Sequence, residues 1–273
     1  MELHYQSFDP TKNITLLVET PVPRALHAPV ARALLARDPS GEQVGFLEPP
    51  TRPGARLHLQ MMGGEFCGNA SLSAAAHCGE ADGLRPGDSA EIPLEVSGSD
   101  GLVLCQITCV EDGVFRGTVA MPLPDRLDTV AVTESLSCPA VFFPGIVHCI
   151  VPADALTAAR AEALIRPLCA RLHAEALGLL LRNDTGFTPL VYVASTDTAV
   201  WESGCGSGSA AIGASLCAQS QATQTVSLTQ PGGSIAVSAV WDGSAVSALS
   251  ITGRVEVGER RTWTPPPGIF PQL

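Results

Sequence analysis

Two cysteines of this 273-residue chain lie in turns of nearly the same composition. Cys67 occurs in GGEFCGNAS and Cys205 in ESGCGSGSA, and a glycine directly follows each of them. Stretches rich in alanine and serine come next, and their composition predicts short helices over residues 69–78 and 208–218. Each sulfur would then lie at a helix N-terminus, where unpaired N–H groups and the helix dipole favour negative charge.

This position is expected to lower the pKa of a thiol and to raise its thiolate fraction. The same N–H groups suit a carboxylate, and glycine lets a ligand approach the backbone closely. If both turns face one substrate, one sulfur can remove a proton from the carbon beside the carboxylate while the other delivers a proton to the opposite face. The pattern therefore predicts inversion of configuration without a cofactor or a metal, with Cys67 and Cys205 as the catalytic pair. The alternative of two ordinary buried cysteines stays open.

Lysine is nearly absent, because Lys12 is the only one in the chain. It lies in DPTKNITLLV, without a glycine-rich loop around it. Pyridoxal phosphate enzymes need a lysine that forms a Schiff base, and phosphate-binding loops need a lysine after their glycines. Both classes are therefore excluded.

The chain is acidic, with a formal net charge of −11 at pH 7. This charge argues against nucleic acids and anionic membrane surfaces as partners, since both require basic patches. No apolar run reaches the length of a membrane span. The first residues, MELHYQSFDPTKN, contain no basic segment followed by an apolar one, so we expect no secretory signal and a cytoplasmic location.

The chain contains nine cysteines, an odd number that argues against a disulfide framework. Cys105 and Cys109 have the closest spacing, and on a strand they would point to the same face. We interpret them as small buried apolar residues. A zinc site is the alternative, although no second pair completes a set of four ligands.

The order of the predicted elements occurs twice along the chain, which indicates an internal repeat. Each half contains strands, a long helix, further strands, a glycine–cysteine–glycine turn and a short helix. In the first half we predict strands over 13–20, 42–49, 55–62, 89–96, 101–110 and 114–121 and a helix over 23–38. In the second half we predict strands over 140–153, 187–196, 197–203 and 225–259 and a helix over 155–177. Residues 121–130 are expected to form a linker, and residues 261–273 an irregular proline-rich tail.

The two cysteine turns resemble motifs of the diaminopimelate epimerase superfamily, which includes proline racemase-like and phenazine-biosynthesis-like proteins. The superfamily motifs are Cys-Gly-Asn-Gly and Cys-Gly-Ser/Thr-Gly. In this chain they read Cys67-Gly68-Asn69-Ala70 and Cys205-Gly206-Ser207-Gly208, with Ala70 as a departure. The wider motifs GGEFCGNAS and VWESGCGSGS are most similar to the histidine racemases of staphylopine-type opine metallophore biosynthesis.

The resemblance implies an α+β fold with two similar domains. Each would be a curled, mostly antiparallel sheet or barrel around a central helix, with the active site in the cleft between the domains. We expect these domains at residues 1–124 and 125–255, with residues 256–273 packing back on the first domain. The resemblance also implies proton transfer by two thiols, a small amino-acid substrate and a homodimer.

Two departures from the superfamily bear on the substrate. Diaminopimelate epimerases usually carry Glu-Arg-Gly before the second cysteine, and that arginine helps to bind the distal end of their substrate. Here Glu202 lies three residues before Cys205 without an arginine beside it. The Gly-Asn-Pro-His segment of the superfamily reads Gly145-Ile146-Val147-His148. A smaller amino acid fits better, with histidine as the leading substrate. Another amino acid such as diaminopimelate, and a non-catalytic ligand- or metal-binding protein of the same fold, remain as alternatives.

Eight residues are expected to bind the substrate. The backbone around four of them would hold the carboxylate: Gly68, Asn69, Gly206 and Ser207. Glu202 would hold the ammonium group, with a capping or solvated carboxylate as the alternative. His148 would orient a thiol or contact the substrate, with a structural histidine as the alternative. Asn13, which matches an early asparagine of the superfamily, and Glu65 complete the set.

Overall fold

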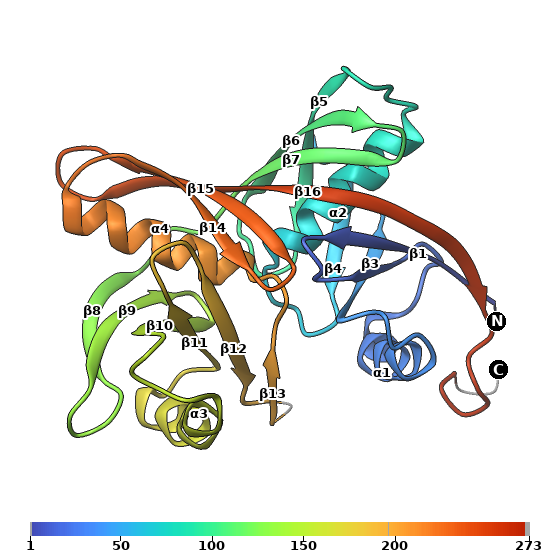
Figure 1. Cartoon of the computed structure of the whole chain (residues 1–273). Coiled ribbons are helices and arrows are strands. Elements are labelled where there is room, and N and C mark those ends of the chain that lie inside the picture. Colours follow the sequence, from blue (N-terminus) through green and yellow to red (C-terminus); the bar gives the residue numbers. More distant parts are fainter. Residues whose placement is uncertain (1, 196, 271–273) are drawn as a thin grey trace. The chain divides into compact units, whose positions relative to one another are not determined.

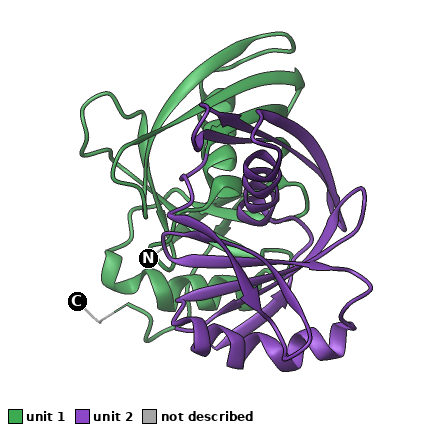
Figure 2. Cartoon of the chain, turned by 90° about the vertical axis from the view of Figure 1, so that its left-hand side faces the viewer, with its two compact units in different colours: residues 1–120, 252–273 green, residues 121–251 purple. Residues whose placement is uncertain are grey.

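The computed structural model describes residues 2–195 and 197–270. The chain folds into two compact units, which are coloured separately in Figure 2. Unit 1 comprises residues 1–120 and 252–273, and unit 2 comprises residues 121–251. The domain division at residues 124/125 and 255/256 stays a prediction.

Unit 1 is a curled sheet around one buried helix (Figure 1). Its strands are β1 (Leu3–Pro10), β2 (Thr15–Val18), β3 (Gln43–Glu48), β4 (Leu57–Met61), β5 (Ser89–Val96), β6 (Leu102–Glu111) and β7 (Val114–Ala120). They are hydrogen-bonded in this order, and β16 (Val246–Trp263), whose residues from 252 onward belong to unit 1, pairs with both β7 and β1. The sheet of unit 1 thus closes on itself. Ile269 and Phe270 pack against the apolar cluster of this unit that contains Leu3.

The helices of unit 1 follow from the connections between its strands. A short 3₁₀ turn (Arg24–Leu26) and α1 (His27–Arg37) connect β2 to β3, which pair in parallel. The helix α2 (Gly68–Ala81) connects β4 to β5, which are also parallel. Parallel neighbours require such a crossover connection. Because α2 packs against strands that include β1, β5, β6 and β7, its alanine and serine side chains are almost all buried.

Unit 2 repeats this order of elements with a different sheet arrangement. Its six-stranded sheet contains β8 (Arg126–Ala131), β9 (Ser137–Phe143), β10 (Ile146–Pro152), β11 (Ala176–Arg182), β12 (Phe187–Val193) and β13 (Thr198–Trp201). The helix α3 (Ala158–Leu172) connects β10 to its parallel neighbour β11 and buries its apolar face against this sheet. The helix α4 (Gly206–Ser220) packs against β14 (Gln224–Gln230) and β15 (Gly233–Trp241), as Figure 1 shows.

The predicted α+β class is confirmed, with curled sheets in both units. Cys105 and Cys109 are buried on one face of β6, as their spacing predicts. No helix in residues 2–195 and 197–270 is long and apolar enough to cross a membrane.

Three predictions about single elements were wrong. Residues 121–130 are not only a linker, because β8 begins at Arg126. The helix predicted to reach residue 177 ends at Leu172, since His173 adopts the left-handed conformation with a φ of 52° and β11 begins at Ala176. The predicted tail begins within a strand, because β16 continues to Trp263. The strands β1 and β11 were not predicted at all. Residue 196 of one predicted strand and residues 271–273 of the predicted tail lie outside the described residues.

Candidate active site

Both motif cysteines are N-caps of buried helices. Cys67 precedes α2 with φ and ψ of −134° and 113°, and its sulfur accepts a hydrogen bond from the N–H of Ala70 at 3.4 Å. Cys205 precedes α4 with φ and ψ of −120° and 106°, and its sulfur accepts from the N–H of Gly208, also at 3.4 Å. In each unit the backbone of the cysteine is extended, and one N–H group of the first helical turn points to its sulfur. This confirms the helix N-terminal position predicted for each thiol.

The Cys67 turn is held by a network of amide side chains. The thiol of Cys67 donates a hydrogen bond to Oε1 of Gln43 at 3.2 Å. Nε2 of Gln43 donates to Oδ1 of Asn13 at 2.8 Å, and Nδ2 of Asn69 donates to the same oxygen at 2.9 Å. Asn13 and Asn69 are both buried, with exposed fractions of 7% and 3%. Their side chains therefore support the turn, and the backbone of residues 68 and 69 is the part that suits a ligand.

Glu65 lies in the exposed part of the same turn. Its carboxylate folds back over Gly63, where an added Cβ would lie only 2.4 Å from Oε2. It accepts hydrogen bonds from the N–H groups of Gly63 and of Glu65 itself. These contacts give Glu65 a local role in shaping the turn, although its flexible carboxylate could move aside for a side chain at residue 63.

The Cys205 turn is fixed through the backbone of the cysteine itself. Oε1 of Gln230 accepts a hydrogen bond from the N–H of Cys205 at 2.6 Å, and Nε2 of Gln230 donates to Oγ of Ser209 at 3.0 Å. Ser209 in turn donates to the carbonyl oxygen of Cys205 at 2.8 Å. Two buried side chains thus hold both polar backbone groups of this cysteine.

The sulfur of Cys205 has an acidic partner. Its thiol is hydrogen-bonded to the carboxylate of Glu202. Burial raises the pKa of Cys205 well above its ordinary value, and the charge and hydrogen bond of Glu202 raise it further. Hydrogen bonds from Ser207 and the N–H of Gly208 act in the opposite direction but are outweighed. The helix N-terminus therefore acts on Cys205 in the predicted direction, but burial and Glu202 outweigh it, and the pKa of Cys205 is raised where a lowered pKa was predicted.

His148 is connected to the sulfur of Cys205 through the hydroxyl of Ser207. Its Nε2 lies 3.0 Å from Oγ of Ser207, and that oxygen lies 3.6 Å from the sulfur of Cys205. The ring is fully buried, and burial lowers the pKa of His148 to about 3, so the ring is neutral at pH 7. An added Cβ at Gly178 would lie 2.2 Å from Nδ1 of His148, so only glycine leaves room for the ring. The interpretation of His148 as a residue that orients a thiol group fits these contacts.

The predicted residues therefore form two groups, each within one unit. In unit 1 the group contains Cys67, Gly68, Asn69 and Asn13, and in unit 2 it contains Cys205, Gly206, Ser207, Glu202 and His148. The sequence analysis missed Gln43 and Gln230. Neither glutamine belongs to a motif, and the one available signal was a polar residue at the end of an otherwise apolar strand pattern.

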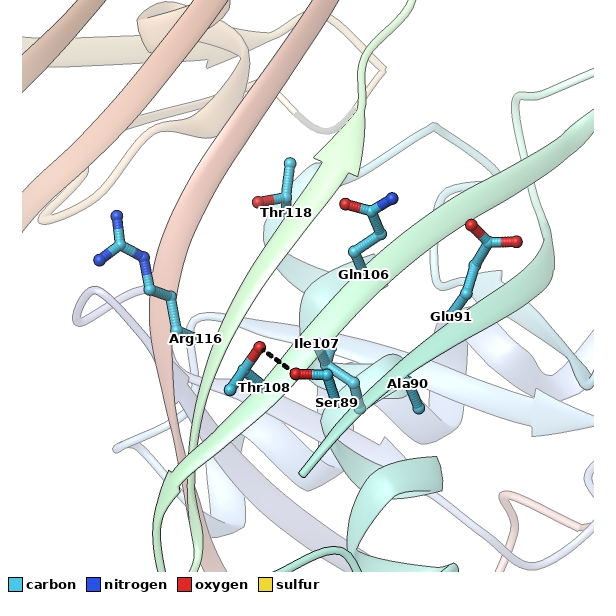
Figure 3. A pocket seen from close by; sticks show the side chains of 8 residues that line it. All are labelled: Ser89, Ala90, Glu91, Gln106, Ile107, Thr108, Arg116 and Thr118. Carbon is cyan, nitrogen blue, oxygen red and sulfur yellow. Dashed lines mark hydrogen bonds between the residues drawn. The ribbon is translucent and has the colours of Figure 1, made fainter. Parts of the chain in front are cut away.

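A separate depression lies on the outer face of β5, β6 and β7, with a volume of ≈ 460 Å³ (Figure 3). Figure 3 shows Glu91, Gln106 and Thr118 projecting from neighbouring strands and a hydrogen bond between Ser89 and Thr108, whose oxygens are 2.8 Å apart. None of the predicted site residues lines it. Among the residues that the structure describes, no three histidine, cysteine, aspartate or glutamate side chains gather as a metal site.

A family model described as the histidine racemase CntK N-terminal domain matches residues 2–260. The chain belongs to this family. One relative, named histidine racemase, from Staphylococcus aureus, is 29% identical over 246 residues, which cover 86% of this chain and 88% of that protein. A second, from Fusobacterium nucleatum and also named histidine racemase, is 28% identical over 77% of this chain and 80% of its own length.

A solved structure has the same fold as this member of the histidine racemase CntK family. A crystal structure of a probable proline racemase from Agrobacterium radiobacter has a TM-score of 0.71 at 16% identity. The match covers 94% of this chain and 92% of that one. The predicted resemblance to the racemase and epimerase superfamily is confirmed.

Proposed function

We propose that this chain is a cofactor-independent isomerase that interconverts L- and D-histidine. Membership of the histidine racemase CntK family supports the substrate, together with two relatives that carry the name histidine racemase. The observation that carries the chemistry is the matched pair of cysteine N-caps, in which each sulfur accepts an N–H hydrogen bond at 3.4 Å.

In the proposed reaction, one cysteine thiolate removes the proton from Cα of histidine, and the other cysteine thiol delivers a proton to the opposite face. One C–H bond breaks and another forms, the configuration inverts, and the two sulfurs exchange their protonation states. The N–H groups around Gly68, Asn69, Gly206 and Ser207 would bind the carboxylate and stabilise the charge that develops beside it. The reaction requires both sulfurs to reach the same carbon.

The groups around Cys205 suit a sulfur that changes its protonation state. Glu202 accepts from the thiol, and its negative charge favours the protonated form. Ser207, which is held by neutral His148, favours the thiolate. Opposing partners of this kind reduce the cost of moving a proton in either direction. Glu202 is also the acidic group that we propose for the substrate ammonium.

The proposal includes a cytoplasmic location, a role in metallophore biosynthesis and a homodimer. The location is supported by the odd number of cysteines, nine, which argues against the disulfide framework of a secreted protein. The role is supported by the resemblance of the two motifs, and light scattering of the purified chain would test the dimer.

Incubation in heavy water tests the enzymatic proposal. The purified, reduced protein is mixed with each common L-amino acid separately, and deuterium at Cα and chirality are measured by mass spectrometry and chromatography. We expect label and D-product with histidine. The same incubation with the Cys67→Ser, Cys205→Ser double variant is the control and should yield neither. Exchange with another amino acid only would contradict histidine as the substrate, and no exchange with any of them would contradict the racemase.

A further inference from the structure

The amide network beside Cys67 has a defined direction, which begins at Glu42. The carboxylate of Glu42 has only acceptor atoms when it is ionised, so it must receive the hydrogen bond at 2.7 Å from Nδ2 of Asn13. This contact fixes which end of the Asn13 amide faces Glu42. Oδ1 of Asn13 then faces the other way and accepts from Gln43 and Asn69.

The same logic fixes the amide of Gln43. Its Nε2 donates both to Oδ1 of Asn13 and to Oγ1 of Thr15, at 2.8 and 2.7 Å. The hydroxyl of Thr15 donates its own proton to the carbonyl oxygen of Asn13 at 3.2 Å, so it can accept from Gln43. With both N–H groups of Gln43 used, its Oε1 faces the sulfur of Cys67 at 3.2 Å.

We propose that Glu42 is a positioning residue that sets the direction of this amide chain, so that an oxygen and not an N–H group faces the sulfur of Cys67. An acceptor oxygen stabilises the S–H form and orients its hydrogen, whereas an N–H group would stabilise the thiolate. The chain through Asn13 and Gln43 thus favours the protonated form of Cys67 in the free protein, against the N–H of Ala70, which favours the thiolate. Its meaning for catalysis rests on the proposed function, but the effect on the thiol does not.

The charges around Glu42 are few. Glu42 as a whole is exposed, but desolvation of its carboxylate raises the pKa of the group. The charge of Asp9 also raises this pKa, whereas the hydrogen bond from Asn13 lowers it. Asp9 is itself paired with Lys12. A protonated or amidated side chain at residue 42 could donate a hydrogen bond to Asn13. The amides of Asn13 and Gln43 could then turn round and keep their mutual hydrogen bond, if the amide of Asn69 turns with them and the hydroxyl of Thr15 donates to Gln43 instead of the carbonyl of Asn13.

The test measures how fast iodoacetamide labels the Cys67 peptide between pH 6 and 9, without substrate, by mass spectrometry. In Glu42→Gln the reversed chain becomes available, and we expect labelling at pH 7 to be about threefold to tenfold faster. Glu42→Asp keeps an acceptor and should restore slow labelling. Glu91→Gln removes the same charge on the outer face of β5 and should change nothing. Labelling of Cys205 in the same samples is the internal reference.

A direct effect of the lost charge must be separated from an effect through the chain. In Gln43→Leu the last link is removed, so adding Glu42→Gln should have no further effect if the chain transmits it. Unchanged labelling in a folded Glu42→Gln protein, or an equal acceleration in the Gln43→Leu background, would overturn the proposal. Because no turnover is measured, a failure here is distinct from a failure of the racemase proposal.

Discussion

The two cysteine turns have the same backbone geometry and different chemical surroundings. In unit 1 the Cys67 sulfur donates to a neutral amide, and the residue is half-buried. In unit 2 the Cys205 sulfur faces the carboxylate of Glu202, and the residue is only 4% exposed. The repeated fold thus places both sulfurs at a helix N-terminus, and the side chains beside them differ: the amide of Gln43 in unit 1 and the carboxylate of Glu202 in unit 2.

The difference matters for a reaction that needs one base and one acid. Two identical thiols would compete for the same protonation state, whereas an acidic neighbour raises the proton affinity of Cys205. Under the proposed mechanism, Cys205 would therefore start as the proton donor in one direction of the reaction. The predictions below are ordered from the largest expected effect to the smallest.

Removing either sulfur should have the largest effect. Cys67→Ser and Cys205→Ser should each lower kcat/KM for histidine racemisation by about 10²–10⁴-fold, because a hydroxyl is a much weaker base than a thiolate. The matched controls are Cys78→Ala and Cys217→Ala, which remove buried sulfurs from α2 and α4 away from the caps. If both serine variants keep rates near those of the unmodified protein, the two-thiol mechanism is wrong.

Replacing Glu202 by glutamine should make the surroundings of Cys205 more like those of Cys67, whose sulfur faces a neutral amide. Because Glu202 raises the pKa of Cys205, Glu202→Gln should move the onset of iodoacetamide labelling of Cys205 to lower pH. The pKa falls because the thiolate loses a neighbouring negative charge and the thiol loses a strong acceptor. Racemisation should slow by about 10²-fold. A labelling profile of Cys205 that stays in place or moves to higher pH would contradict the asymmetry.

The smallest expected effect compares two buried serines at matching positions. Ser71 and Ser209 each donate to the carbonyl oxygen of their cap cysteine at 2.8 Å, but only Ser209 also accepts from Gln230. Ser209→Ala leaves Nε2 of Gln230 buried without that acceptor and should cost about 1–3 kcal/mol of unfolding free energy. Ser71→Ala should cost less than about 1 kcal/mol. Urea denaturation measures both, and equal losses would show that the glutamine adds nothing.

Much of the fold was predictable because alternation and helical spacing reflect burial directly. The strands β6 and β7 alternate clearly between buried and exposed residues. Prediction from the sequence failed where this signal is absent. Residues 176–181 form an apolar run after α3, and such a run fits a buried strand as well as a helix. The strand β8 has one buried residue, Val130, and therefore no pattern to detect.

The candidate site was also predictable only in part. The cysteine caps were predictable because a helix N-terminus leaves a local signature of glycine and small polar residues. Gln43 was not, because its position depends on strand pairing: the parallel register of β2 and β3 places it opposite Thr15, 28 positions earlier. Gln230 lies at the end of β14, 25 positions after Cys205, and it meets that cysteine only in the folded chain.

The strand β16 has a consequence for the order in which the chain is made. Residues 121–251 of unit 2 are contiguous and are complete before the ribosome adds the last strand pairs of unit 1. In unit 1, Leu3 pairs with Trp263 and Pro10 with Val255, so β1 must wait for these residues of β16, which are made after unit 2. During translation unit 1 therefore carries an open β edge at β1 until β16 has emerged.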